Sequence, residues 1–149
     1  MNASGLYNLG DAALAAINAA TAAAVITSDA DQQGATQAYI DDLDGMLAAT
    51  IQVNFTWGSG GTSLKVMIET TLDDGTTWIE VARLAFATAS EENIVNLSGL
   101  TPKTTVYTPA ALSDDTVVDG ILGPRWRARI LAVGTFAGNT SLSVRMQAR

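Results

Sequence analysis

The sequence predicts a mainly-β protein, namely an antiparallel β-sandwich with jelly-roll or Greek-key wiring and an Ala-rich N-terminal arm. Three observations support this fold class. Apolar and polar residues alternate with a period of two in several segments. Turns rich in Gly, Asp and Asn separate these segments at short intervals, and no long helical pattern interrupts them. We therefore expect an arm and linker over residues 1–34 and a β-sandwich domain over residues 35–149.

The composition argues against most enzyme classes. The chain has 149 residues, enough for one domain with a substantial core. It contains no Cys and no His, which excludes disulfides, thiolate chemistry, the Ser-His-Asp triad and the commonest zinc ligand. No apolar run reaches the ~18 residues that a membrane span needs. We expect a protein that is not an enzyme, uses no cofactor and does not enter a membrane.

The arm is Ala-rich and carries no charge between Ala12 and Ser28. Asp11 is a suitable helix cap, and the residues that follow it recur at helical spacing: Leu14, Ile17, Thr21 and Val25. These features predict a helix, although Ala-rich segments also form flat strands. Two roles stay open, because the arm either lies against a neighbouring protein or packs on its own domain.

Two acidic turns invite a calcium interpretation, which their spacing does not support. An EF-hand loop needs an acidic first ligand and a Glu at the twelfth position. With Gly45 at the sixth position, Ile40 is first and Ile51 is twelfth. The segment over residues 115–120 fails in the same way. Both segments are therefore interpreted as turns, and no metal site is predicted.

The clearest strand runs from Met46 to Trp57, with Ile51, Val53 and Phe55 on one face and polar residues on the other. A glycine-rich loop over residues 58–61 leads into a second alternating run, and a third begins at Trp78. We expect these three runs to form three consecutive antiparallel strands.

The second and third runs are joined by the stretch T-L-D-D-G-T-T-W, from Thr71 to Trp78. Gly75 can take the positive φ of a tight turn, and Asp73 can accept backbone N–H groups. The pattern resembles the Asp-box, S/T-x-D-x-G-x-T-W, on the residues Thr71, Asp73, Gly75, Thr77 and Trp78. The resemblance implies a structural hairpin and not an active site.

A weaker strand is expected over residues 91–97, followed by a long irregular excursion from Gly99 to Pro124 that holds all three prolines. A segment of this length is usually a functional loop or an inter-subunit contact. Within it, Thr104 to Thr108 is expected to form a short edge strand.

Strong strand patterns return after Pro124. Arg125, Arg127 and Arg129 share one face, and Trp126 lies on the other with Ala128 and Ile130. A turn over residues 134–139 and a last alternating run over residues 140–146 complete the domain. By their parity, all three tryptophans are expected to face the core: Trp57, Trp78 and Trp126.

Charge is divided along the chain, whose formal net charge is −7. Every ionisable side chain before Lys65 is acidic, and every one after Gly120 is basic. This division indicates contacts between the two ends of one chain or between copies, although plain solubility explains it equally well. We expect the three arginines to contact another subunit or an acidic capsid surface. The acidic total argues against nucleic acid as their partner.

The strand pattern resembles small structural proteins of tailed bacteriophages and gene transfer agents, through residues 61–82 and 123–144. The resemblance covers roughly residues 48–146 and implies a capsid decoration or cement protein, with no catalytic residues. It implies virion partners, above all the major capsid protein, and a homo-oligomer, with a trimer favoured. The expected location is the head surface of the virion, after synthesis in the bacterial cytoplasm.

Two alternatives to a decoration protein are kept. One is a head–tail connector, head-spike or tail component. The other is a carbohydrate-binding β-sandwich module, which the three tryptophans suggest and their core-facing parity opposes.

Overall fold

The alternating segments form the strands of two antiparallel sheets in the computed structural model, which describes residues 4–14, 24–26 and 38–149. The strands within these ranges are β1 (Gly5–Ala13), β2 (Ala24–Ile26), β3 (Ala48–Thr56), β4 (Ser59–Gly60), β5 (Ser63–Thr71), β6 (Ile79–Phe86), β7 (Glu91–Ser98), β8 (Thr116–Val117), β9 (Arg125–Val133), β10 (Phe136–Ala137) and β11 (Ser141–Ala148).

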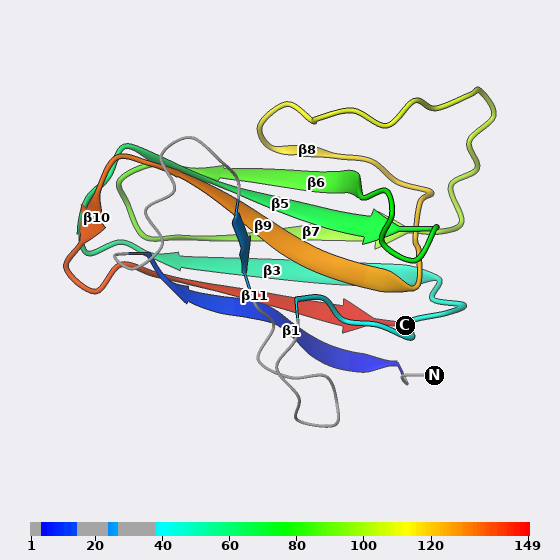
Figure 1. Cartoon of the computed structure of the whole chain (residues 1–149), viewed down its shortest axis with the longest axis horizontal. Coiled ribbons are helices and arrows are strands. Elements are labelled where there is room, and N and C mark those ends of the chain that lie inside the picture. Colours follow the sequence, from blue (N-terminus) through cyan, green and yellow to red (C-terminus); the bar gives the residue numbers. More distant parts are fainter. Residues whose placement is uncertain (1–3, 15–23, 27–37) are drawn as a thin grey trace.

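One sheet has four strands in the order β1-β11-β3-β7, and the other has five in the order β2-β9-β5-β6-β8. A short ribbon of β10 and β4 joins their ends. Figure 1 shows one sheet above the other, with the strands running roughly along the long axis of the molecule. The predicted mainly-β, antiparallel architecture is confirmed, and the jelly-roll or Greek-key wiring stays a prediction.

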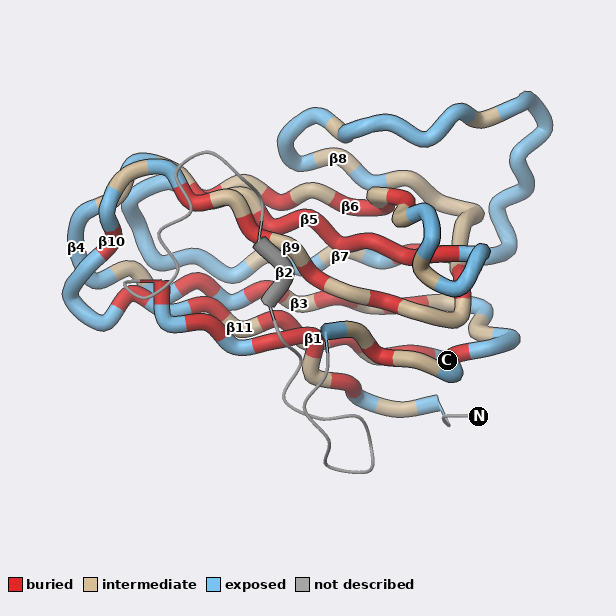
Figure 2. Tube along the Cα trace, in the orientation of Figure 1, coloured by how far each residue is buried: buried red, intermediate tan, exposed pale blue. Residues whose placement is uncertain are grey.

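The core lies between the two sheets and is built by alternation. On β3, Ile51, Val53 and Phe55 are fully buried, while their neighbours face outward. Phe55 meets Phe86 of the other sheet at a ring-centroid distance of 5.4 Å and Phe136 at 6.0 Å. Figure 2 shows the same alternation along β9 and β11, where buried residues alternate mainly with residues of intermediate exposure. This period of two is what a sheet with one buried face requires.

Strands β5 and β6 form the predicted hairpin, with one irregularity. Ile68 lies opposite Ala82 and Glu69 lies opposite Glu80, so Val81 is an extra residue on β6. Such a β-bulge shifts the alternation of the strand that contains it. Val81 and Ala82 are consequently both buried.

The prediction of three consecutive antiparallel strands is wrong, because β3 and β5 belong to different sheets. The glycine-rich loop carries the chain across the end of the sandwich instead of turning it back. It passes very close to the turn before β11, since a Cβ placed on Gly58 would lie 1.7 Å from the Gly138 carbonyl oxygen. Only glycine allows this approach between the two segments.

The helix predicted from Asp11 is wrong for the described residues of the arm. Residues 5–13 form β1, which pairs with β11 from Gly5 opposite Ala148 to Ala13 opposite Ser141. Residues 24–26 form β2, and the rest of the predicted helix, residues 15–23, lies outside the described residues. Tertiary pairing overrides the local helical spacing here.

Strand β1 also supplies core side chains, since Tyr7, Leu9 and Leu14 are buried. The predicted boundary at residue 34 therefore does not separate residues 4–14 from the sandwich. Of the two roles left open for the arm, packing on its own domain holds for this part of it.

The excursion after β7 is irregular, as expected, but its edge strand is elsewhere. Residues 104–108 form no strand, whereas Thr116 and Val117 pair with β6 as β8. Asp115, next to β8, accepts the Ala85 backbone N–H at 3.0 Å. This contact and the ladder bonds hold the short strand at the sheet edge.

Because β1 completes the core, replacing Leu9 by Ala should lower the free energy of unfolding by about 2–5 kcal/mol. Leu9 is 1% exposed, whereas Leu6 on the same strand is 65% exposed and serves as the matched control. Leu6→Ala should change stability by no more than ~0.5 kcal/mol. Denaturant unfolding of both variants makes the measurement. Equal, small losses in the two variants would show that β1 is not part of the core.

Candidate functional site

Side-chain hydrogen bonds organise the hairpin loop after β5. The Thr71 hydroxyl donates to Asp73 Oδ1 (2.8 Å) and accepts the Gly75 backbone N–H (3.0 Å). The same Asp73 oxygen accepts the Thr77 N–H at 2.7 Å. Gly75 has a φ of 90°, where an L side chain would be strained. The structure thus brings these four residues of the Asp-box pattern into one loop with a closed set of bonds.

These bonds lower the pKa of Asp73 below its ordinary value of 3.8. The first cause is the Thr77 backbone N–H, and the second is the Thr71 hydroxyl. Both donors favour the charged carboxylate. Asp73 is therefore ionised at neutral pH and acts as an acceptor in the loop.

Trp78, the last residue of the pattern, lies on the outer face, so its predicted core-facing parity is wrong. Ile79 and Val81 take the inward positions of β6, which leaves Trp78 outside. The Arg127 guanidinium lies over its ring at 4.1 Å from the centroid, and the Tyr39 ring packs beside it at 6.0 Å. This cation–π contact joins the hairpin to β9.

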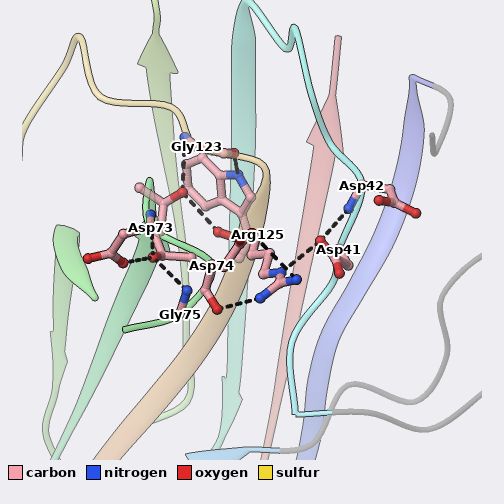
Figure 3. A network of polar contacts seen from close by, with 10 residues as sticks. Asp41, Asp42, Asp73, Asp74, Gly75, Gly123 and Arg125 are labelled. Atoms are coloured by element: carbon pink, nitrogen blue, oxygen red, sulfur yellow. Dashed lines mark hydrogen bonds and ion pairs between the residues drawn. The ribbon is translucent and has the colours of Figure 1, made fainter. Parts of the chain in front are cut away.

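Arg125 joins the hairpin to the acidic turn before β3. Its Nε donates to Asp41 Oδ1 at 2.9 Å, and its Nη1 donates to the Asp74 carbonyl oxygen. Figure 3 shows the Arg125 side chain extended between these two acceptors. One arginine thus connects β9 to two loops that are far apart in sequence.

Arg127 and Arg129 share a single carboxylate, that of Glu69 on β5. Arg127 Nε donates to Glu69 Oε2 at 2.6 Å, and Arg129 Nη1 donates to Glu69 Oε1 at 2.9 Å. Glu69 is only 5% exposed, and it lies directly opposite Arg127 in the ladder. A buried carboxylate is tolerated when charged hydrogen-bond donors satisfy both of its oxygens, as they do here.

A second acidic residue lies beside this cluster, because Glu80 is directly opposite Glu69 on β6. Like charges in facing positions destabilise a sheet. Glu69 and Glu80 nevertheless have separate cationic partners. Arg127 and Arg129 bind Glu69, and Arg83 binds Glu80 through two bonds of 2.6 and 3.1 Å. The Leu112 backbone N–H also donates to Glu80, which ties the excursion to this face.

The three arginines therefore have acidic partners within their own chain. Of the acidic residues near the turns, Asp41 binds an arginine of β9, while Asp114 pairs with Lys65 at 3.1 Å. Asp11 pairs with Arg145 at 3.0 Å, so acidic N-terminal residues do contact basic C-terminal ones. A subunit or capsid contact through the arginines is not needed to neutralise them, and it stays a prediction.

Glu69, the residue on which two of the arginines depend, is not among the site residues that the sequence predicts. The alternation of β5 does place it on the face opposite Val66 and Ile68. Its partners lie 58 and 60 residues further along the chain. Only the register between β5 and β9 shows that they meet, and no local pattern encodes that register.

The hairpin loop and the excursion after β7 come together at one end of the sandwich (Figure 1). Large apolar side chains of these segments are exposed. Leu72 and Val106 line a shallow cleft there, together with Tyr107 and Ile121. Leu72 is 65% exposed and Val106 is 97% exposed. Burial in a partner is the usual role of such a gathering of apolar side chains.

No three His, Cys, Asp or Glu residues within residues 4–14, 24–26 and 38–149 lie close enough to hold a metal ion. The same part of the chain contains no helix long and apolar enough to cross a membrane. No protein-family model, curated protein or solved structure matches this chain.

Because Glu69 is shared by two arginines, Glu69→Gln should lower the free energy of unfolding by roughly 1–3 kcal/mol. The amide keeps the shape of the side chain but loses the charge that both guanidinium groups bind. Asp114→Asn is the control, since its ion pair with Lys65 is solvent-exposed and contributes only about 0–1 kcal/mol. Urea unfolding compares the two variants. A loss for Glu69→Gln no larger than the control's would contradict the role given to this carboxylate.

The low pKa of Asp73 predicts how stability depends on pH. In the unfolded chain the carboxyl has its ordinary pKa, and in the folded chain the pKa is lower. The ionised group therefore stabilises the fold above its ordinary pKa, and this contribution is lost as the pH falls through the folded-state value. Asp73→Asn should melt below wild type at pH ~6 and converge with it near pH ~2. Melting curves that stay parallel over this range would contradict the assignment.

Proposed function

We propose that this chain is a non-enzymatic structural protein of a phage-type virion, and in particular a decoration or cement protein that binds the major capsid protein on the head. The observation that supports this proposal best is a group of exposed apolar side chains at one end of a well-packed sandwich. The group consists of Leu47 (58% exposed), Leu72 (65%), Leu100 (75%) and Val106 (97%).

These side chains come from loops that meet at the same end. Leu72 and Val106 line one cleft between the hairpin loop and the excursion. The Leu47 backbone carbonyl accepts the Gly99 N–H at 2.8 Å, and this bond places Leu47 next to Leu100. The four thus provide two apolar contacts at this end, on loops held by a β-scaffold.

Lys103 lines the cleft itself, over the Tyr107 ring, but the turns around this end are acidic. Asp44, Asp73 and Asp74 are exposed on the neighbouring turns. An apolar surface with acidic neighbours fits a partner surface whose apolar centre is flanked by Lys or Arg. We expect the capsid-facing partner to have this chemistry.

The same geometry favours a structural role over carbohydrate binding. Sugar rings stack on open aromatic faces, but Trp126 is fully buried and Arg127 covers Trp78. Trp57 packs partly against the core and donates its indole N–H to the Gly60 carbonyl. A head–tail connector, head-spike or tail component remains the second candidate, because the same apolar end would serve there.

The proposal predicts that Leu72→Asp combined with Val106→Asp removes particle binding without unfolding the protein. Both side chains are exposed, so the melting temperature should stay close to that of wild type. Loss of two central apolar contacts should weaken binding to purified heads by at least about 30-fold. Val133→Asp, at the opposite end of the sandwich, is the matched control and should bind normally.

Co-sedimentation with heads that lack the protein measures binding, and electron microscopy of the decorated particles shows the location. Density spread over the shell is the expected result. A ring of density at one vertex would instead assign the protein to the head–tail junction. No binding to heads or tails, by wild type as well as by the variants, would overturn the proposal.

A further inference from the structure

Strand β7 lies at the edge of the four-stranded sheet and has one free side. It pairs with β3 from Ala48 opposite Ser98 to Phe55 opposite Glu91. On its other side, the Ser98 N–H donates to Asp119 Oδ1 (3.0 Å), and the Gly120 N–H donates to the Ser98 carbonyl (2.9 Å). The peptide groups of Ser98 thus face away from β3 and are already occupied.

The period of two places the peptide groups of three more residues on this free side, those of Glu92, Ile94 and Asn96. The Thr50 hydroxyl donates to Asn96 Oδ1 at 2.7 Å, as expected for a facing pair that exchanges no backbone bonds. Within the described part of the chain, no backbone bond reaches these three residues on the free side. Three consecutive sites for strand addition are therefore open.

The side chains at these sites are unusual for a protected edge. Natural edge strands are shielded by charges, prolines or bulges along their length. On β7 the charges stand only at one end, at Glu91 and Glu92, while Ile94 at the centre is 55% exposed. The middle of the strand therefore carries a large apolar side chain beside unpaired peptide groups.

We propose that a second copy of this chain pairs with β7 along this edge, antiparallel and with the two-fold axis at Ile94. In this register Ile94 faces Ile94 of the partner subunit, and Glu92 faces Asn96 of the partner subunit on both sides of the axis. Every open peptide group then bonds to the partner, while the occupied groups of Ser98 stay outside the contact. The dimer has one continuous sheet that runs through both copies.

Other registers are less complementary. If the axis lies at Glu92, the two carboxylates face each other and repel. If the axis is moved instead toward Asn96, Ser98 falls within the contact. Its peptide groups are already bonded to Asp119 and Gly120. The register at Ile94 alone uses all three open sites and puts no like charges opposite each other.

The side chains at the ends of the contact also fit. Asn96 uses its oxygen to accept the Thr50 hydroxyl, which directs its amide N–H groups elsewhere. In the proposed register they face the Glu92 carboxylate of the other copy, an acceptor. A two-fold contact gives dimers and not the trimer that the resemblance to virion proteins favours, and it uses neither Leu72 nor Val106. It is therefore independent of the proposed virion role.

Sedimentation equilibrium of the full chain tests the proposal. A charge swap between residues 92 and 96 restores dimerisation only if these residues face each other across the two subunits. Asn96→Glu places two pairs of like charges across the axis and should weaken dimerisation about tenfold. Adding Glu92→Lys to that variant makes both pairs opposite in charge and should return the dissociation constant to within about threefold of wild type. Residues 92 and 96 lie about 13 Å apart along one strand, so the rescue cannot arise within a chain.

Ile94→Pro provides a second test. Proline removes the one N–H at the centre of the contact, and this N–H has no backbone partner among the described residues, so the fold should be kept. A folded monomer is the expected result, with the far-ultraviolet circular dichroism and melting temperature of wild type as the check on folding. The proposal is overturned if the wild-type chain is monomeric at ~100 µM, if it forms trimers, if Ile94→Pro still dimerises, or if Glu92→Lys does not rescue Asn96→Glu.

Discussion

Burial of the Glu69 carboxylate constrains the whole outer face of the five-stranded sheet. A carboxylate that is only 5% exposed is costly unless cations bind it, and here Arg127 and Arg129 bind one oxygen each. Both arginines must then lie on the outer face of β9. Their alternation with Trp126, Ala128 and Ile130 directs these three side chains into the core. The buried Glu69 carboxylate thus favours the same orientation of β9 as the burial of Trp126, Ala128 and Ile130 does.

The same pairing positions the hairpin. Arg127 lies over Trp78, and Arg125 reaches the Asp74 carbonyl, so β9 holds the loop from both sides. The loop in turn satisfies its own backbone through Thr71 and Asp73, which makes it a rigid element. Because the polar groups of this face bind one another within the described part of the chain, the proposed partner surfaces lie elsewhere, at the apolar end and at the edge of β7. The two proposed contacts use different residues, Glu92 to Asn96 for the dimer and Leu72 and Val106 for the virion contact.

The parts of the fold that depend on local information could be predicted from the sequence. The alternation in β3, β9 and β11 reports a buried face directly, and the turn residues of the hairpin bond to their own neighbours. The strand β1 was missed because it contains Gly, Asn and Asp, which are depleted in strands, and because its register is interrupted between Asn8 and Gly10. Its pairing with β11 also involves residues more than 120 positions away. The crossover between β3 and β5 was missed because a glycine loop does not specify which sheet the next strand joins.

The residues of the candidate site fall into the same two groups, those that local sequence predicts and those that depend on distant strand pairing. Thr71, Asp73 and Gly75 were found because their spacing carries the loop geometry. Glu69 was not found, since its importance arises from the register between two strands that are distant in sequence. The exposed apolar side chains were also not identified, because exposure depends on the path of the excursion and not on the residues alone.

A double-mutant cycle between Glu69 and Arg127 tests the central claim most directly. The variants Glu69→Gln, Arg127→Gln and the pair together are compared by denaturant unfolding, which isolates the interaction between the two side chains. If the buried pair holds β9 and the hairpin on β5, the coupling free energy should be at least about 1 kcal/mol. If the effects of the two single substitutions add to that of the double variant within about 0.3–0.5 kcal/mol, the claim that this pair holds β9 on β5 is contradicted.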